Sequence, residues 1–212
     1  MNANTVLSKV QRVFEGFENL NLNEQVLVLN TVREYLMSIS PFQEPVDMVR
    51  WVPAEDVIQN DYNPNSVAPP EMKLLEISIR EDGYTQPIVV YHDEQNGIYT
   101  VVDGFHRSRV GKEIIDIHDR LHGYLPVVVI DKDLKNRMAS TIRHNRARGK
   151  HQVDKMGDIV KGLSANGMSE TEIEINLGMT EEERVRLSQI AGIAHLFANK
   201  EYTRAWGELS DE

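Results

Sequence analysis

The sequence predicts an α/β (α+β) fold, in which a small mixed sheet lies between helical segments. Short β-branched runs alternate with helical patterns between residues 48 and 147, whereas the flanking segments have helical spacing alone. The 212 residues, 41% of them hydrophobic, suit one compact domain with helical additions. We therefore expect an N-terminal helical segment (1–45), a central α/β domain (46–149) and a C-terminal, helix-turn-helix-like domain (150–212).

The composition excludes several classes of site. The sequence contains no cysteine, so disulfides, thiolate metal sites and cysteine nucleophiles are ruled out, and a reducing cytoplasm is favoured. No apolar run approaches the roughly 18 residues that span a bilayer, and the first residues lack a signal-peptide core. We expect a cytoplasmic protein without membrane contact. A net charge of −10 opposes nonspecific coating of DNA.

The N-terminal segment, residues 5–40, predicts two helices. Asn21 with Glu24 fits a capping box at the start of the second helix. In that helix Leu29, Val32 and Leu36 recur on one face. The face either docks on the main domain or forms a surface for a partner or a homodimer. Residues 40–45 (SPFQEP) predict a linker.

The first half of the central domain predicts a strand, a loop and a helix, at residues 48–52, 60–70 and 71–80. The loop holds three prolines and three asparagines. The helix turns Met72, Leu75 and Ile79 inward, and Gly83 is well placed to end it.

The second half of the central domain predicts a hairpin followed by a helix, a strand and a basic helix. Residues 87–91 and 98–102 are the hairpin strands, and the turn DEQNG joins them. A helix begins near His106, a strand follows at 125–130, and a helix at 133–147. Seven basic residues and two acidic ones between 131 and 150 suit either a nucleic-acid backbone or a triphosphate.

The motif VVDGFHRSRVGKE (101–113) carries the chemistry, because an apolar strand ends in a tight Asp-Gly turn and a helix starts at once. Free amides and the dipole at such a helix start attract an anion. Gly104 lets a phosphate approach the main chain, Arg107 can grip two phosphate oxygens, and His106 can donate a hydrogen bond. Asp103 could hold Mg²⁺ or accept a proton from an attacking hydroxyl.

Four segments, taken in their order along the chain, resemble the ParB/sulfiredoxin superfamily across about half of the sequence. They are IREDGYTQPIVV, VVDGFHRSRVG, LPVVVI and HNRAR. The resemblance implies a ParB/sulfiredoxin-type domain whose motifs surround one nucleotide. It implies a nucleotide pocket at Thr85, Gln86 and Pro87, and phosphate binding by Gly104, Phe105, His106, Arg107, Ser108, Arg109, Asn145 and Arg148.

The whole chain is similar to the IbrB subgroup of ParB-like proteins, which are described as co-activators of gene expression. That resemblance implies a phosphoadenosine-phosphosulfate-reductase-like partner, IbrA. Phe105 stands where sulfiredoxins have their reactive cysteine, so sulfinic-acid reduction is excluded. Partition-type ParB proteins have Gly-Glu-Arg-Arg in this loop and Glu-Asn in the later helix, where this chain has Gly-Phe-His-Arg and His144-Asn145. Loss of that glutamate argues against a CTP-driven clamp. The free-serine kinases have Asp-Gly-His-His-Arg, matched at four of five positions, and that likeness implies Glu55 as a catalytic base.

The leading hypothesis is a Mg-nucleotide-binding regulator that acts with a partner protein or DNA. It would hydrolyse ATP or CTP slowly, or switch on binding a nucleotide such as ATP, ADP or CTP. The first alternative is a phosphotransferase that uses Glu55 or Asp103 as base on free serine or a protein hydroxyl. The second is a DNA-binding adaptor with a vestigial pocket.

Two further patterns carry less weight. The segment 166–193 has helix-turn-helix spacing, with Ser169 and Thr180 as caps and Gly178 in the turn. Three glutamates at 181–183 open its second helix, which opposes entry into a DNA groove. His118 and His122 are four residues apart and could share a metal on a helix, but no third ligand stands out.

Overall fold

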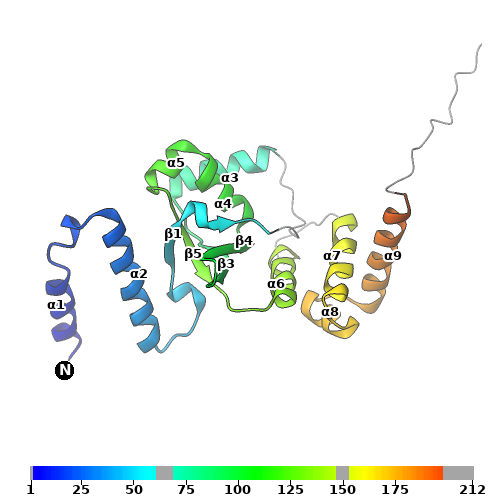
Figure 1. Ribbon diagram of the computed structural model, residues 1–212, viewed down its shortest axis with the longest axis horizontal. Helices are drawn as coiled ribbons and strands as arrows, with labels where there is room; N and C mark the ends of the chain where they lie inside the picture. Colours follow the sequence, from blue (N-terminus) through cyan, green and yellow to red (C-terminus); the bar gives the residue numbers. More distant parts are fainter. Residues whose placement is uncertain (1, 61–68, 147–152, 198–212) are drawn as a thin grey trace, which may run out of the picture. The chain divides into compact units, whose positions relative to one another are not determined.

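The computed structural model describes residues 2–60, 69–146 and 153–197. The chain forms two compact units, residues 1–59 with 68–131 and residues 60–67 with 132–212. The first unit contains the sheet, whereas the described part of the second is helical (Figure 1). Among the helices in the described ranges, none has both the length and the apolar character needed to cross a membrane.

A mixed sheet forms the centre of the first unit, as the sequence predicted. In the described residues its strand order is β1-β5-β3-β4-β2. The strands are β1 (Arg50–Pro53), β2 (Val57–Ile58), β3 (Ile88–Asp93), β4 (Ile98–Asp103) and β5 (Tyr124–Val129). The predicted hairpin pairs β3 with β4 antiparallel, and β3 runs parallel to β5. β1 joins β5 antiparallel, and β2 joins β4 parallel.

The helices of the first unit begin and end at local signals in the sequence. They are α1 (Ala3–Val13), α2 (Leu22–Ile39), α3 (Pro69–Asp82), α4 (Phe105–Glu113) and α5 (Ile115–Arg120), with short 3₁₀ turns η1 (Phe17–Asn19), η2 (Pro45–Asp47) and η3 (Ala54–Asp56). Asn21 and Glu24 form the predicted capping box. Gly83, at φ 77°, donates its amide to Ile79 O as predicted. Most of the loop predicted at 60–70 lies outside the described residues.

α2 docks on β1, which is one of the two roles expected for it, and polar side chains of the helix bond to the main chain beside it. Asn30 Nδ2 donates to Trp51 O at 2.8 Å, and Asn30 Oδ1 accepts from Trp51 N at 2.9 Å. Arg33 donates to Val49 O at 2.9 Å. Of the three residues on the predicted apolar face, Leu29 and Val32 are half-buried, whereas Leu36 is 53% exposed. Each of these hydrogen bonds satisfies a main-chain group at the edge of the sheet, which an apolar side chain cannot do.

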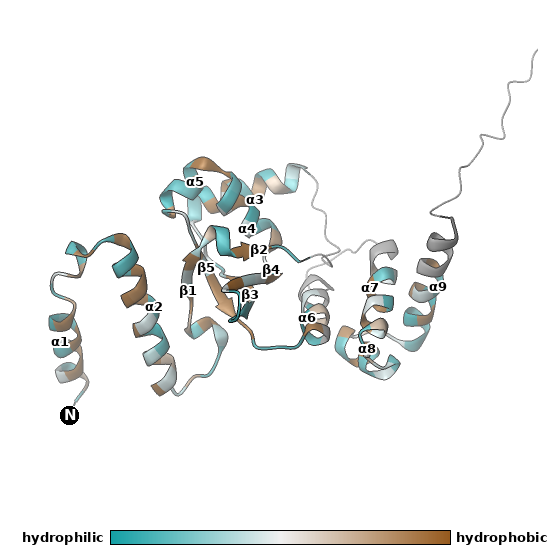
Figure 2. Ribbon diagram, viewed as in Figure 1, coloured by the Kyte–Doolittle hydropathy of each residue, from teal (hydrophilic) through white to brown (hydrophobic). Residues whose placement is uncertain are grey.

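The core of the first unit lies where the sheet meets α3, α4 and α5. The strands are among the most hydrophobic parts of the chain (Figure 2). Ile88, Val90, Val101, Leu125 and Val127 are fully buried in the sheet. A second cluster joins the helices through Ile79, Val110 and Ile117, with Met72 and Leu75 packed against it as predicted.

The second unit consists, in its described part, of α6 (Leu134–Arg146), α7 (Val153–Ala165), α8 (Glu170–Leu177) and α9 (Glu181–Phe197). Its core contains residues from all four helices. Ser169 caps α8, and Gly178, at φ 60°, ends it; Thr180 Oγ1 accepts from Glu183 N at the start of α9. The predicted caps and turn are thus confirmed.

Candidate functional site

The turn between β4 and α4 is built as the sequence predicted. Asp103 is the last residue of β4 and is 6% exposed. Gly104 follows at φ 93°, ψ 25°, and Phe105 starts α4 at once. Because side chains disfavour this left-handed region, glycine is the residue that allows the strand to turn into the helix in one step.

The N-terminus of α4 has no side-chain cap. The first amide bonded along the helix is that of Ser108, which donates to Gly104 O at 2.9 Å. The amides of Phe105 and His106 precede that bond and have no helical carbonyl to reach. Together with the helix dipole they make this turn favourable for a negative charge.

Arg107 folds back onto the turn and connects three of the predicted site segments. Its Nη1 donates to Gln86 Oε1 at 3.1 Å, and its Nη2 lies 3.3 Å from Pro87 O and 3.5 Å from Asp103 Oδ2. A Cβ on Gly104 would lie 2.9 Å from Nη2, so the guanidinium packs directly on the glycine. The neighbouring residue Thr85 is exposed.

His106 presents an imidazole without a hydrogen-bond partner in the described residues. Both ring nitrogens are buried, and neither makes a hydrogen bond. Burial lowers the pKa of His106, and the nearby Arg109 charge lowers it further. The ring meets Phe105 edge-on at 5.2 Å. A neutral imidazole held in this way can donate one hydrogen bond to an incoming anion.

Other side chains of α4 are occupied by contacts inside the protein. The fully buried Ser108 hydroxyl donates to Phe105 O at 2.8 Å and accepts from Gln59 Nε2 at 2.6 Å. Arg109 makes two 2.8 Å bonds to Glu113, one turn further along. Tyr84 donates its hydroxyl to the Arg107 carbonyl, and burial raises the pKa of Tyr84 to about 12. These contacts hold the first turn of α4 in place.

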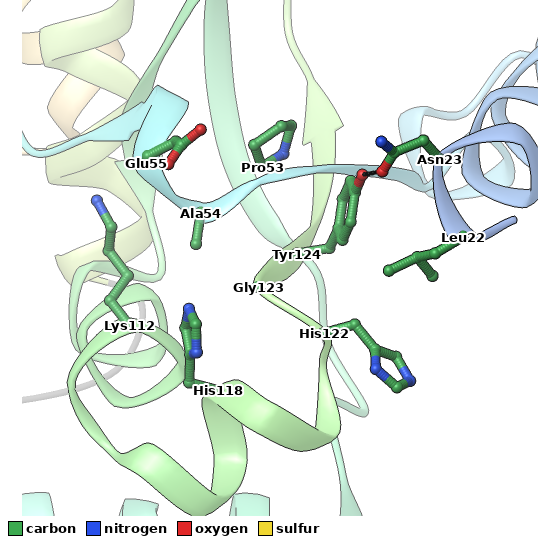
Figure 3. Close-up of a pocket in the computed structure, with 10 residues that line it drawn as sticks. All are labelled: Leu22, Asn23, Pro53, Ala54, Glu55, Lys112, His118, His122, Gly123 and Tyr124. Carbon is green, nitrogen blue, oxygen red and sulfur yellow. Dashed lines mark hydrogen bonds between the residues drawn. The ribbon is translucent and has the colours of Figure 1, made fainter.

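A cavity of about 660 Å³ lies elsewhere in the first unit. Glu55, the predicted base, is exposed at its rim on η3 (Figure 3). Lys112 and His118 also line the cavity, and sequence reasoning assigned no role to Lys112. His122 follows the end of α5 at φ 52°, and its ring points away from His118 (Figure 3). The pair therefore does not share a helix face, and no cluster of three metal-ligating side chains occurs in the described residues.

The remaining predicted residues are not brought to the turn by any described contact. Asn145 lies in α6, within the second unit, and its side chain is outside what the structure describes. Arg148 lies outside the described residues. Their predicted contact with phosphates stays a prediction.

Two family models match the chain and together cover most of it beyond the N-terminal helices. Residues 41–145 match the ParB N-terminal domain, and residues 151–199 match the IbrB-like C-terminal HTH domain. Fold and site thus define a ParB-like protein with a C-terminal helix-turn-helix domain. A curated relative, the uncharacterized protein YbdM of Escherichia coli K12, is 48% identical over 197 residues, covering 92% of this chain and 94% of the relative. The chain belongs to the ParB-like family of the IbrB type.

Two of the solved structures that are similar to this chain are of a chromosome-partitioning ParB protein. The C-terminally truncated ParB of Caulobacter crescentus complexed with CTP-γ-S is 21% identical at a TM-score of 0.40, covering 71% of this chain and 87% of that one. The same truncated protein complexed to the centromeric parS site is 20% identical at a TM-score of 0.44, covering 67% and 70%.

Proposed function

We propose that this protein binds the polyphosphate of a nucleotide at the β4–α4 turn and responds to it as a regulator. The observation that carries the proposal is that one uncapped helix start supplies three groups of hydrogen-bond donors. They are the amides before Ser108, the unpartnered ring of His106 and the guanidinium of Arg107. Each group donates hydrogen bonds, so together they suit a ligand rich in anionic oxygens.

The Asp103–Arg107 contact supplies a means of switching. At 3.5 Å it is a long ion pair between two largely buried side chains. A phosphate at the turn would compete for the same guanidinium, since short, bidentate contacts to phosphate are favoured over a single long one. Asp103 would then lose its contact with Arg107. The segment of Gln86 and Pro87 would change its position, because it also contacts Arg107.

Magnesium would enter with the nucleotide. Asp103 is the one acidic side chain that the turn itself supplies, and the described residues contain no group of three ligating side chains. This donor set fits Mg²⁺ held mainly by phosphate oxygens and water, with one carboxylate from the protein. When bound, the ion would neutralise phosphate charge, and Asp103 would orient it or accept a proton.

The downstream action assigned to this switch is transcriptional or other DNA-associated regulation with a partner. An IbrA-like protein of the phosphoadenosine-phosphosulfate-reductase family and a second copy of the chain are the proposed protein partners. DNA contact by the helix-turn-helix is a less favoured part of the proposal, because the start of α9 presents glutamates and its first arginine is engaged. Arg184, at the start of α9, is buried against Glu174 and Glu170 at 2.8 and 2.9 Å. The exposed side chains Glu181 and Glu182 precede it.

Phosphotransfer is a second proposed activity, and the likeness of residues 103–107 to the free-serine kinases supports it, with Glu55 as the candidate base. This carboxylate is exposed on η3, which packs against α4, and it forms no ion pair within 4.0 Å in the described residues. An unpaired carboxylate is free to accept a proton from a hydroxyl. Transfer of label from [γ-³²P]ATP to serine or a protein hydroxyl, lost in Glu55→Gln, would establish this activity over slow hydrolysis.

Calorimetry with ATP, ADP and CTP, each with and without Mg²⁺, tests the binding proposal. Phosphate release measured in parallel separates hydrolysis from binding alone. Arg107→Ala should weaken binding by about 10- to 100-fold, because a hydrogen bond to a charged group contributes about 1.5–3 kcal/mol. Arg12→Ala, on the exposed α1, is the matched control and should bind normally. Absence of heat with every nucleotide, or equal affinity in Arg107→Ala, would refute the proposal.

A further inference from the structure

We propose that Lys132 and Arg143 bind a dianionic phosphate, either inorganic phosphate or a phosphate monoester. Lys132 precedes α6, and Arg143 lies in the last turn of α6 and reaches α8. All the groups that form this site belong to the second unit. None of them is among the residues predicted to bind the nucleotide, so the proposal does not rest on the proposed function.

Two cationic side chains converge on one buried hydroxyl. Lys132 Nζ and Arg143 Nη2 each donate to Ser140 Oγ at 2.9 Å, so the two positive charges are at most twice that distance apart. Ser140 is 1% exposed, and the two bonds occupy both lone pairs of its hydroxyl oxygen. A neutral hydroxyl offsets little of the repulsion between like charges at this separation, whereas an anion between them would replace it by attraction.

No carboxylate neutralises the pair within the ranges that the structure describes. There, neither Lys132 nor Arg143 forms an ion pair within 4.0 Å. Asp131 and Asp133, beside Lys132, are exposed, and Asp133 accepts from the amide of Asn136 at 2.9 Å. The glutamates of α8 have other partners, which are Ser169 for Glu172, and Arg184 for Glu170 and Glu174. The site therefore keeps both positive charges, which one dianion balances.

The donors are held in place, and some of their N–H groups remain for a ligand. Arg143 Nη1 donates to Asn176 Oδ1 at 2.9 Å and to Asn176 O at 3.3 Å, which fixes the guanidinium against α8. Arg143 thus uses three of its five N–H groups, and Lys132 uses one of three. Both side chains are only half-buried. Several converging donors suit a tetrahedral phosphate, whose oxygens accept from more than one direction.

Charge distinguishes this ligand from the backbone of a nucleic acid. A phosphate monoester carries close to two negative charges at neutral pH, whereas each phosphodiester of a nucleic acid carries one. A diester would therefore leave one of the two cations without a counter-charge. The dianion is the ligand that the charges of this site favour.

Calorimetry of the full-length protein with inorganic phosphate, methyl phosphate and dimethyl phosphate tests the proposal. At about pH 8 the first two are dianions and should bind. Dimethyl phosphate, a monoanion of similar size, should bind about tenfold more weakly or worse. The binding should persist in Arg107→Ala, so failure of this site and failure of the nucleotide site are separately visible. Absence of binding by both dianions, or equal binding of dimethyl phosphate, would overturn the proposal.

Variants assign the contacts. Lys132→Gln and Arg143→Gln should each weaken phosphate binding by about tenfold or more. Lys132→Gln is the decisive change, because Arg143→Gln also removes the bonds to α8 and so destabilises the second unit. The matched control is Lys161→Gln on α7, since Lys161 makes no hydrogen bond or ion pair in the described part of the chain. Unchanged affinity in Lys132→Gln, or an equal loss in Lys161→Gln, would refute the site.

A duplex DNA arm separates the dianion from a backbone phosphate. Duplex binding that is lost in Lys132→Gln, in a protein that binds neither dianion, would assign the two cations to a nucleic-acid backbone and overturn the proposal. Phosphate binding that is lost in Lys132→Gln, with no effect of that change on any DNA binding, is the result expected.

Discussion

Replacement of Gly104 by alanine should destabilise the first unit through two separable costs. A side chain in the left-handed region at φ 93° costs about 1–2 kcal/mol. The new Cβ would also lie 2.9 Å from Arg107 Nη2 and 3.2 Å from Nε, so the guanidinium must move. Losing its bonds to Gln86 and Pro87, at about 1 kcal/mol each, adds about 2 kcal/mol. We expect Gly104→Ala to lower the free energy of unfolding by about 3–4 kcal/mol.

Gly97 provides the matched control, because it lies in the hairpin of the same sheet at φ 69°, and a Cβ added there would meet no atom within 4 Å. Gly97→Ala should therefore cost only the backbone term, about 1–2 kcal/mol. In an Arg107→Ala background the Gly104→Ala cost should fall to the same value. Urea denaturation followed by Trp51 fluorescence, with Trp206 replaced by phenylalanine, measures each difference. Equal costs for Gly104→Ala and Gly97→Ala in the parent background would refute the contact between glycine and guanidinium.

Three further outcomes are expected. Tyr84→Phe removes the bond to the Arg107 carbonyl and should cost about 1 kcal/mol in the same urea assay; no change would mean that the bond contributes nothing. Because burial lowers the pKa of His106, the unfolded chain binds a proton more readily than the folded one, so stability falls as the pH drops below about 6.5. The urea midpoint of His106→Gln should depend less on pH there, and an identical pH profile would contradict this. Arg184→Gln should lower the thermal midpoint of the second unit by leaving two glutamates unpaired, whereas Arg186→Gln, at an exposed position, should not; equal midpoints would mean that the two ion pairs of Arg184 contribute nothing.

The predictions that held rest on signals contained in a few neighbouring residues. The β3–β4 hairpin, the capping box at Asn21 and the glycine that ends α3 are of this kind. β2 was missed because two residues have no period of their own, and the strand exists through its pairing with β4. The exposed position of Leu36 has a related cause. The spacing of apolar residues does not show that a helix is held by hydrogen bonds from its polar side chains to the main chain of a strand.

The two candidate sites of the first unit also differ in how close together their residues lie in the sequence. The β4–α4 turn could be predicted because Asp103, Gly104 and Arg107 are close together in the sequence, and the resemblance added Gln86 and Pro87. The 660 Å³ cavity could not be predicted, since its lining comes from separate segments that only the fold brings together. No motif marks Lys112 as belonging with Glu55. The left-handed backbone at His122, which separates it from His118, likewise has no signature in the spacing of the two residues.

The hydrogen bond from Tyr124 to Asn23 has a consequence for how the protein can be divided. The wall that it anchors comes from α2, which precedes the segment that matches the ParB N-terminal domain, residues 41–145. A chain shortened to begin at residue 41 would keep the whole β4–α4 turn but would open the cavity on one side. A single deletion should therefore separate the two features, because the α/β core alone keeps the turn and loses one wall of the cavity.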